Sequence, residues 1–324
     1  MKKNRLLLFA HDAGSANMII AYIYFYKNKY SEILAFPQGP AKKLSQIYIQ
    51  EYMTTESLFF FQTDTVVTGT SGIDSEYEMK IIIQAREANV HKIITILDNT
   101  ANFNMRFSLH GKLLKKEFLP DEIWIDQENF KSDIDYFNKH IVYKNNIYDK
   151  YIIKLFKNNP PKFTNKNIIK YNGSYLVILT DYLSDLYGNL FGFSEFDYLE
   201  NILNVIDKLH LDVAIFIKLH PSEKNTKYDP IITKYQNLNI FKDDFNVHEL
   251  IYYSRVVFGM SSSVFKEAIM FEKSCFSIQI GATKDMQTIL ESKFNIKSKD
   301  ILIEILLYYF KLKIVKKGKI KWKI

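Results

Sequence analysis

Short apolar runs alternate with amphipathic stretches along most of the chain. This alternation is typical of βαβ units, and therefore of parallel sheets covered by helices. The apolar runs predict strands at residues 6–9, 33–36, 65–67, 92–97, 122–125 and 140–142, and at 175–179, 213–217, 238–241, 256–258 and 274–278. The amphipathic stretches predict helices at 17–25, 41–52, 75–88, 146–157, 195–209, 230–235, 247–253, 263–271 and 300–310.

A polar segment, residues 158–167, interrupts this pattern and contains Pro160 and Pro161. Proline lacks a backbone N–H and restricts the residue before it, so the segment is a natural linker. We expect an N-terminal Rossmann-like domain over 1–160, a second over 168–310, and a tail over 311–324. The predicted fold class is α/β, with two doubly wound domains facing a cleft, the architecture called GT-B.

Composition is that of a folded protein, with 47% hydrophobic and 24% charged residues. The first apolar run stops at His11 and Asp12, which favours a strand over a signal peptide. One cysteine, Cys275, excludes a disulfide framework and fits a reducing cytoplasm, where burial in the core is its expected role.

The formal charge of +7 is concentrated in the last fourteen residues, which hold seven lysines and no acid. Such a tail either binds anionic lipid headgroups or is a solvated terminus, and the sequence leaves both open. The first alternative places a cytoplasmic protein at the inner face of the membrane. No basic stripe appears elsewhere, so we expect no nucleic-acid partner.

Two motifs of the second half follow predicted strands. Lys218-Leu219-His220-Pro221 ends one strand, and Ser261-Ser262-Ser263 ends another and opens a helical pattern. Ligands of open parallel sheets bind at the carboxyl ends of strands, and helix N-termini favour phosphate. We therefore expect a site for a nucleotide phosphate here. Glu267, one turn further on, either binds a ribose hydroxyl or faces solvent.

The first half offers polar residues at two strand ends. His11, Asp12, Gly14, Ser15 and Asn17 follow the first strand. We expect His11, Gly14, Ser15 and Asn17, together with Arg106 further along the chain, to contact an acceptor; alternatively, Asp12, Ser15 or Asn17 caps the next helix. Asp98 follows the fourth strand, with Arg106 close behind. It either takes a proton from an acceptor hydroxyl, caps a turn, or pairs with Arg106. No spacing predicts a metal site, and no dinucleotide fingerprint predicts a cofactor.

These residues resemble the motifs of bacterial GT-B sialyltransferases and polysialyltransferases. Those enzymes carry an Asp-Asp/Glu-Gly motif, a Lys-x-His-Pro motif and a Ser-Ser motif; capsule Kdo transferases and CDP-glycerol transferases share the last two. Here Asn99 and Thr100 replace the expected acid and glycine after Asp98, which leaves Asp12 as a rival base. The resemblance implies that His220, Ser262 and Ser263 contact the donor phosphate and that Asp98 deprotonates the acceptor.

The sequence thus predicts an inverting, metal-independent glycosyltransferase that needs no cofactor. Its donor is a nucleotide-activated sugar, CMP-linked by preference, and its acceptor is a surface polysaccharide or a lipid-linked glycan. Three alternatives stay open: a CDP-glycerol-type glycerophosphotransferase, a sugar-nucleotide 2-epimerase, and an inactive glycan-binding scaffold.

Overall fold

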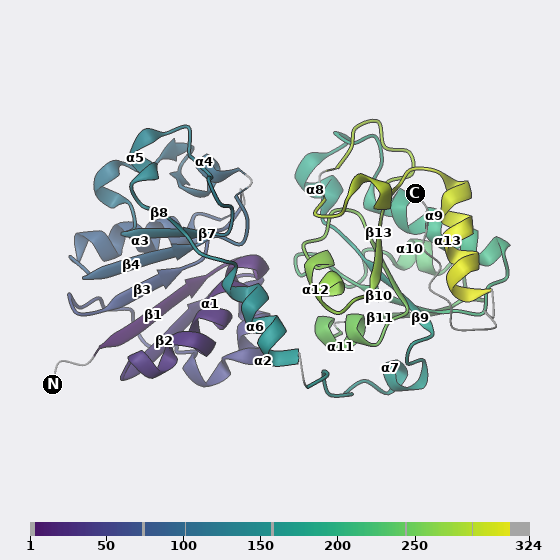
Figure 1. Cartoon of the computed structure of the whole chain (residues 1–324), viewed down its shortest axis with the longest axis horizontal. Coiled ribbons are helices and arrows are strands. Elements are labelled where there is room, and N and C mark those ends of the chain that lie inside the picture. Colours follow the sequence, from purple (N-terminus) through teal and green to yellow (C-terminus); the bar gives the residue numbers. More distant parts are fainter. Residues whose placement is uncertain are drawn as a thin grey trace. The chain divides into compact units, whose positions relative to one another are not determined.

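A computed structural model describes residues 4–72, 75–100, 102–156, 159–243, 245–286 and 288–311. The chain divides into two compact units, Met1–Lys157 (unit 1) and Asn158–Ile324 (unit 2). Each unit has its own six-stranded sheet with flanking helices (Figure 1). Apart from Lys311, the basic tail lies outside the described residues.

The main sheet of unit 1 is parallel and has the order β2-β1-β3-β4-β7-β8. Its strands are β1 (Arg5–Ala10), β2 (Glu32–Pro37), β3 (Thr65–Thr68), β4 (Lys92–Ile96), β7 (Glu122–Ile125) and β8 (Ile141–Tyr143). A short antiparallel hairpin consists of β5 (Ser108–Leu109) and β6 (Lys112–Leu113). β2 lies on one side of β1, and β3 and the later strands lie on the other. The direction of the strand order therefore reverses between β1 and β3, which is the switch point of this sheet.

The helices of unit 1 cover both faces of that sheet. They are α1 (Ala13–Tyr26), α2 (Ala41–Tyr48), α3 (Tyr77–Glu87), α4 (Phe103–Arg106), α5 (Asp135–Asn138) and α6 (Ile147–Phe156), with single turns η1 (Lys27–Lys29), η2 (Gln50–Tyr52) and η3 (Lys116–Phe118). Leu7 and Phe9 of β1 pack in one core with α3. Leu6 and Leu8, which alternate with them, are fully buried as well. Burial on both faces explains why the strand is apolar throughout.

The sheet of unit 2 is also parallel, in the order β11-β10-β9-β12-β13-β14. Its strands are β9 (Tyr175–Leu179), β10 (Ala214–Lys218), β11 (Asn239–Asp243), β12 (Val256–Gly259), β13 (Ser274–Ile278) and β14 (Asn295–Ile296). If the six strands are numbered 1 to 6 along the chain, their order in the sheet is 3-2-1-4-5-6, which is that of the dinucleotide-binding fold. The switch point of this sheet lies between β9 and β12.

Helices flank this sheet on two sides as well (Figure 1). They are α7 (Lys166–Lys170), α8 (Leu183–Tyr187), α9 (Glu195–Lys208), α10 (Asp229–Ile232), α11 (Val247–Tyr252), α12 (Phe265–Met270) and α13 (Lys299–Phe310), with a turn η4 (Ser292–Phe294). Leu176 and Ile178 of β9 belong to the core with α9 and α13. Tyr175, Val177 and Leu179 belong to the core with α11 and α12.

The predicted strands are all present, and the α/β class with two doubly wound sheets is confirmed. The helix starts were less accurate. Helix α1 begins at Ala13 rather than at residue 17, and α12 begins at Phe265 rather than at residue 263. None of the described helices has the length and apolar character needed to cross a bilayer.

Candidate functional site

In unit 2, three polar loops follow the neighbouring strands β10, β9 and β12. Lys218 ends β10, Asp181 lies just beyond β9, and Ser261 lies just beyond β12. Because the strands are parallel and adjacent, their carboxyl ends lie at one edge of the sheet. The Lys-x-His-Pro motif after β10 and the serines after β12 therefore lie at the same edge of the sheet, with β9 between their strands.

Hydrogen bonds fix both the backbone and the ring of His220. Its own N–H lies 3.1 Å from Thr180 Oγ1 and 3.0 Å from Glu223 Oε2. Its Nδ1 accepts the Ser222 N–H at 3.2 Å. In the neutral ring the proton must then sit on Nε2, which makes Nε2 a donor. Tyr182 lies nearly parallel to the ring, with centroids 6.3 Å apart.

Glu223 fixes the loop that carries His220. Its carboxylate is fully buried, accepts the Tyr228 hydroxyl at 2.5 Å and pairs with Lys227 at 3.0 Å. Lys227 also pairs with Asp185 and Glu195. Burial opposes the charge on Lys227, but the hydrogen bonds to Glu195, Glu223 and Asp185 outweigh it and raise its pKa.

The three serines do not act as one group. Ser261 donates from N–H (2.8 Å) and hydroxyl (3.3 Å) to Asp181 Oδ2. Burial raises the pKa of Asp181, whereas the hydrogen bonds from Ser261 lower it. Ser262 accepts the Val264 N–H at 3.3 Å, and Ser263 is exposed. The serines thus form a turn ahead of α12, which has six residues, rather than the start of a longer helix.

The remaining predicted donor-site residues differ in exposure. Lys218 is half-buried at the end of β10, and Pro221 is exposed in the loop. Glu267 is 4% exposed, so the alternative that it faces solvent is wrong.

In unit 1, the residues after β1 contact the loop after β3. His11 Nδ1 lies 2.8 Å from Asp12 Oδ1, and Asp12 Oδ2 accepts the Gly72 N–H at 2.9 Å. Asp12 occupies the N-cap position of α1, but its side chain makes no capping bond. Its carboxylate instead joins the two loops at the β1/β3 switch point.

Glu78 of α3 lies beneath this pair and is 1% exposed. It accepts hydrogen bonds from the His11 N–H (2.8 Å), Ser15 Oγ (3.0 Å) and Ser71 Oγ (2.7 Å). Burial raises the pKa of Glu78, although the bonds from Ser71 and His11 oppose that shift. Ser15 therefore lies inside α1, where its hydroxyl binds Glu78, and it does not cap the helix. Asn17 also lies inside α1, so it is not a cap either.

Asp98, just beyond β4, pairs with Arg106 as one alternative predicted. Its Oδ1 lies 2.8 Å from Arg106 Nη1 and accepts the Asn99 N–H at 2.9 Å. Arg106 also donates to Thr70 Oγ1 at 2.8 Å. Gly14 packs against Asp98 so closely that a Cβ there would lie 2.3 Å from Asp98 Oδ2. This arrangement joins the ends of β1, β3 and β4.

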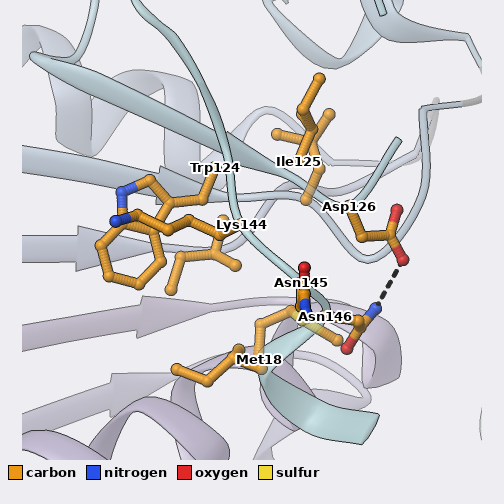
Figure 2. Close-up of a pocket in the computed structure, with 10 residues that line it drawn as sticks. Met18, Trp124, Ile125, Asp126, Lys144, Asn145 and Asn146 are labelled. Atoms are coloured by element: carbon orange, nitrogen blue, oxygen red, sulfur yellow. Dashed lines mark hydrogen bonds between the residues drawn. The ribbon is translucent and has the colours of Figure 1, made fainter. Parts of the chain in front are cut away.

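Figure 2 shows a small hollow elsewhere in unit 1, where β4, β7 and β8 end. Asn146 donates to Asp126 at 3.1 Å, and the Lys144 ammonium lies 5.4 Å from the Trp124 ring centroid. The hollow is lined by Met18, Ile96, Leu97, Trp124, Ile125, Asp126, Lys144, Asn145, Asn146 and Ile147. The sequence predicted no functional role for any of these residues. Within the ranges that the structure describes, no group of three or more His, Cys, Asp or Glu side chains is placed to hold a metal ion.

Known structures share this fold, although no protein-family model and no curated protein matches the sequence. UDP-GlcNAc 2-epimerase from Methanocaldococcus jannaschii is 14% identical with a TM-score of 0.58, covering 95% of this chain and 93% of that one. Its complex with UDP-GlcNAc and UDP, at 12% identity, gives 0.56 with the same coverage. Anabaena Alr3699/HepE, bound to UDP-glucose, is 10% identical with a TM-score of 0.52, covering 94% and 89%. The fold is GT-B.

Within this GT-B chain, sequence reasoning missed Glu78, Asp181 and Glu223. Each is a buried or half-buried carboxylate that accepts from a predicted site residue. For Glu223, its place three residues after His220 in the same loop was an available signal. Glu78 and Asp181 lie 67 and 80 residues from their partners, so no local pattern marks them. The narrower resemblance to sialyltransferases stays a prediction.

Proposed function

We propose that this chain is an enzyme that acts on a nucleotide-activated sugar, and that unit 2 binds the donor phosphate. The observation that carries the proposal is the orientation of His220. Because Nδ1 accepts the Ser222 N–H, the neutral ring presents Nε2–H as a donor at the carboxyl edge of the sheet. Half-buried Lys218 lies at the same edge and adds positive charge.

The reaction we propose is inverting, metal-independent glycosyl transfer. An acceptor hydroxyl loses its proton to a base on unit 1, and its oxygen bonds to the anomeric carbon as the bond to the phosphate oxygen breaks. His220 Nε2–H stabilises the charge that develops on that oxygen. We propose a CMP-linked sugar as donor and a surface polysaccharide or lipid-linked glycan as acceptor, with Ser262, Ser263, Pro221 and Glu267 lining the donor site.

The first experiment measures thermal stabilisation of the full chain by CMP, CDP, UDP, GDP and NAD. A nucleotide at 100 times its dissociation constant stabilises the native state by about 2.7 kcal/mol, which shifts a melting curve measurably. Selective stabilisation by CMP supports the proposed donor, and CDP or UDP redirects the search to glycerophosphate or hexose donors. If no nucleotide shifts the curve, the donor-site proposal fails.

A 2-epimerase is the second candidate, and the fold likeness to UDP-GlcNAc 2-epimerases favours it. The two reactions differ in their need for an acceptor. NMR analysis of UDP-GlcNAc incubated with the protein alone would show the C2 epimer only if the chain is an epimerase. A transferase converts its donor only when an acceptor is added, apart from slow hydrolysis.

A further inference from the structure

The pair His11–Asp12 at the carboxyl end of β1 has the geometry of an oriented base. The distance between His11 Nδ1 and Asp12 Oδ1 is 2.8 Å. The other carboxylate oxygen of Asp12 is occupied by the Gly72 N–H at 2.9 Å. Both oxygens of Asp12 are therefore fixed, and the carboxylate cannot turn away from the imidazole without breaking a second bond.

This contact determines which nitrogen of His11 carries the proton. An ionised carboxylate only accepts hydrogen bonds, so Nδ1 must be the donor to Asp12. In the neutral ring Nε2 is then unprotonated and has a free lone pair. His11 thus has the opposite tautomer to His220, whose Nδ1 accepts a backbone N–H. His11 is thus set to accept a proton, whereas His220 is set to donate a hydrogen bond.

The backbone around His11 holds the ring in place. Gly39 lies against the imidazole so closely that a Cβ there would lie 2.5 Å from Nε2, and its φ is +47°. The backbone N–H of His11 is anchored on Glu78 at 2.8 Å. The side chain of His11 is 23% exposed, so the ring is partly accessible. The charged groups around it are Asp12 in the same loop, Glu78 from α3, and the pair Asp98–Arg106 against Gly14.

Asp98 is less suited to take a proton because most of its lone pairs already accept hydrogen bonds. Oδ1 accepts from Arg106 and from the Asn99 N–H, and Oδ2 accepts from Asn99 Nδ2 at 3.1 Å. A carboxylate has about four acceptor positions, so three are filled within the unit. Oδ2 also packs against the Gly14 backbone. These contacts favour a role for Asp98 in holding Arg106 and the loop ends together.

We propose that His11 is the general base of the transfer and that Asp12 is its positioning residue, an inference that rests on the proposed function. His11 Nε2 takes the proton of the acceptor hydroxyl while the oxygen forms its bond to the anomeric carbon. The resulting imidazolium is stabilised by the Asp12 carboxylate, and the nucleotide phosphate leaves with the bonding electron pair. The acceptor is therefore a hydroxyl compound, such as a glycan, bound beside the β1 and β3 loops.

The tautomer can be tested without a substrate. In ¹⁵N-histidine-labelled full-length protein at pH 8, the His11 signals are identified by their absence in His11→Gln. We expect a protonated Nδ1 and an unprotonated Nε2. In Asp12→Asn the amide oxygen keeps the Gly72 N–H and the amide NH₂ faces Nδ1, so the proton should move to Nε2. A wild-type His11 protonated at Nε2 would overturn the inference, because that nitrogen could not then accept a proton.

Transfer kinetics test the catalytic role. CMP-N-acetylneuraminate and UDP-GlcNAc serve as donor probes, with a panel of glycans as acceptors. We expect His11→Gln and Asp12→Asn each to lower kcat by about 100-fold or more, the size of general-base effects. Stabilisation by the donor nucleotide should be unchanged, and the fall in rate toward acid pH should disappear in His11→Gln. The control His91→Ala removes an exposed histidine of the same unit and should transfer normally.

The two levels of the proposal fail differently. If the wild type transfers sugar and His11→Gln keeps the wild-type rate and pH profile, the assignment of His11 is wrong while the proposed function stands. If the wild type transfers neither donor probe to any acceptor, the proposed function fails and the base assignment fails with it.

Discussion

A single backbone contact decides the chemistry available to His220. The Ser222 N–H holds Nδ1 as an acceptor, so only Nε2 can donate toward a ligand. The sequence could predict that a histidine lies at this strand end, since the apolar run of β10 stops just before it. It could not predict the tautomer, which depends on the turn geometry after Pro221.

His220→Ala should abolish transfer, because the donor to the leaving phosphate is lost. Stability should change little, since the backbone bonds of residue 220 to Thr180 and Glu223 remain. The measurement pairs steady-state turnover with a urea unfolding curve, and His91→Ala is the control. Turnover at the wild-type rate would remove His220 from the mechanism.

His248 in α11 predicts a pH dependence of stability. It is 3% exposed, and burial lowers its pKa to about 4. An unfolded histidine titrates near 6.5, so below that pH the unfolded chain binds more protons and stability falls as pH drops toward 4. The loss at pH 5 should be about 2 kcal/mol. Urea unfolding of His248→Leu at pH 7 and pH 5 should lack this component, whereas His91→Ala should retain it. Equal pH dependence in both variants would contradict the prediction.

The elements were predictable to different degrees. The parallel strands are buried on both faces, so they stand out as apolar runs, and all eleven predicted strands exist. The strands missed, β5, β6 and β14, have two residues each and therefore carry no pattern. The start of α1 was misplaced because Ala13, Gly14 and Ser15 resemble a turn. Tertiary contacts override that preference, since Ser15 pairs with Glu78 and Gly14 packs against Asp98.

The close packing of α1 on the β4 loop predicts the effect of Gly14→Ala. The added Cβ would lie 2.3 Å from Asp98 Oδ2, so α1 or the Asp98–Arg106 pair must move. Such overpacking costs about 1–3 kcal/mol. Gly72→Ala is a matched control, because its Cβ would meet only Asp12 Oδ2, at 3.8 Å, which is an ordinary contact. Urea unfolding should therefore give a lower free energy of unfolding for Gly14→Ala than for Gly72→Ala. Equal values would show that the loop carrying Asp98 moves without cost.

At the scale of the whole molecule, each unit has a sheet and cores of its own, and the proposed roles divide between them. In unit 2, the contacts of His220 with Ser222 and of Asp181 with Ser261 lie in the proposed phosphate site. Unit 1 has the oriented pair His11–Asp12. If this division holds, a nucleotide alone should protect unit 2 and leave unit 1 unchanged.

The chain carries a separate probe for each unit. Cys275 of β13 is the one cysteine of the sequence, is 7% exposed, and burial raises the pKa of its thiol to about 11. Its labelling by a thiol reagent therefore requires opening of unit 2. Trp124 of β7 reports on unit 1 by fluorescence once Trp322 is replaced in Trp322→Phe.

A saturating nucleotide from the stabilising panel should slow Cys275 labelling in the Trp322→Phe protein. At 100 times its dissociation constant the expected factor is about 100, the kinetic equivalent of about 2.7 kcal/mol when labelling follows the opening equilibrium. The urea transition seen by Trp124 should stay in place. His220→Ala should lose most of the protection, because the phosphate loses its donor. Protection of Trp124 rather than Cys275 would place the nucleotide on unit 1 and reverse the proposed division of roles.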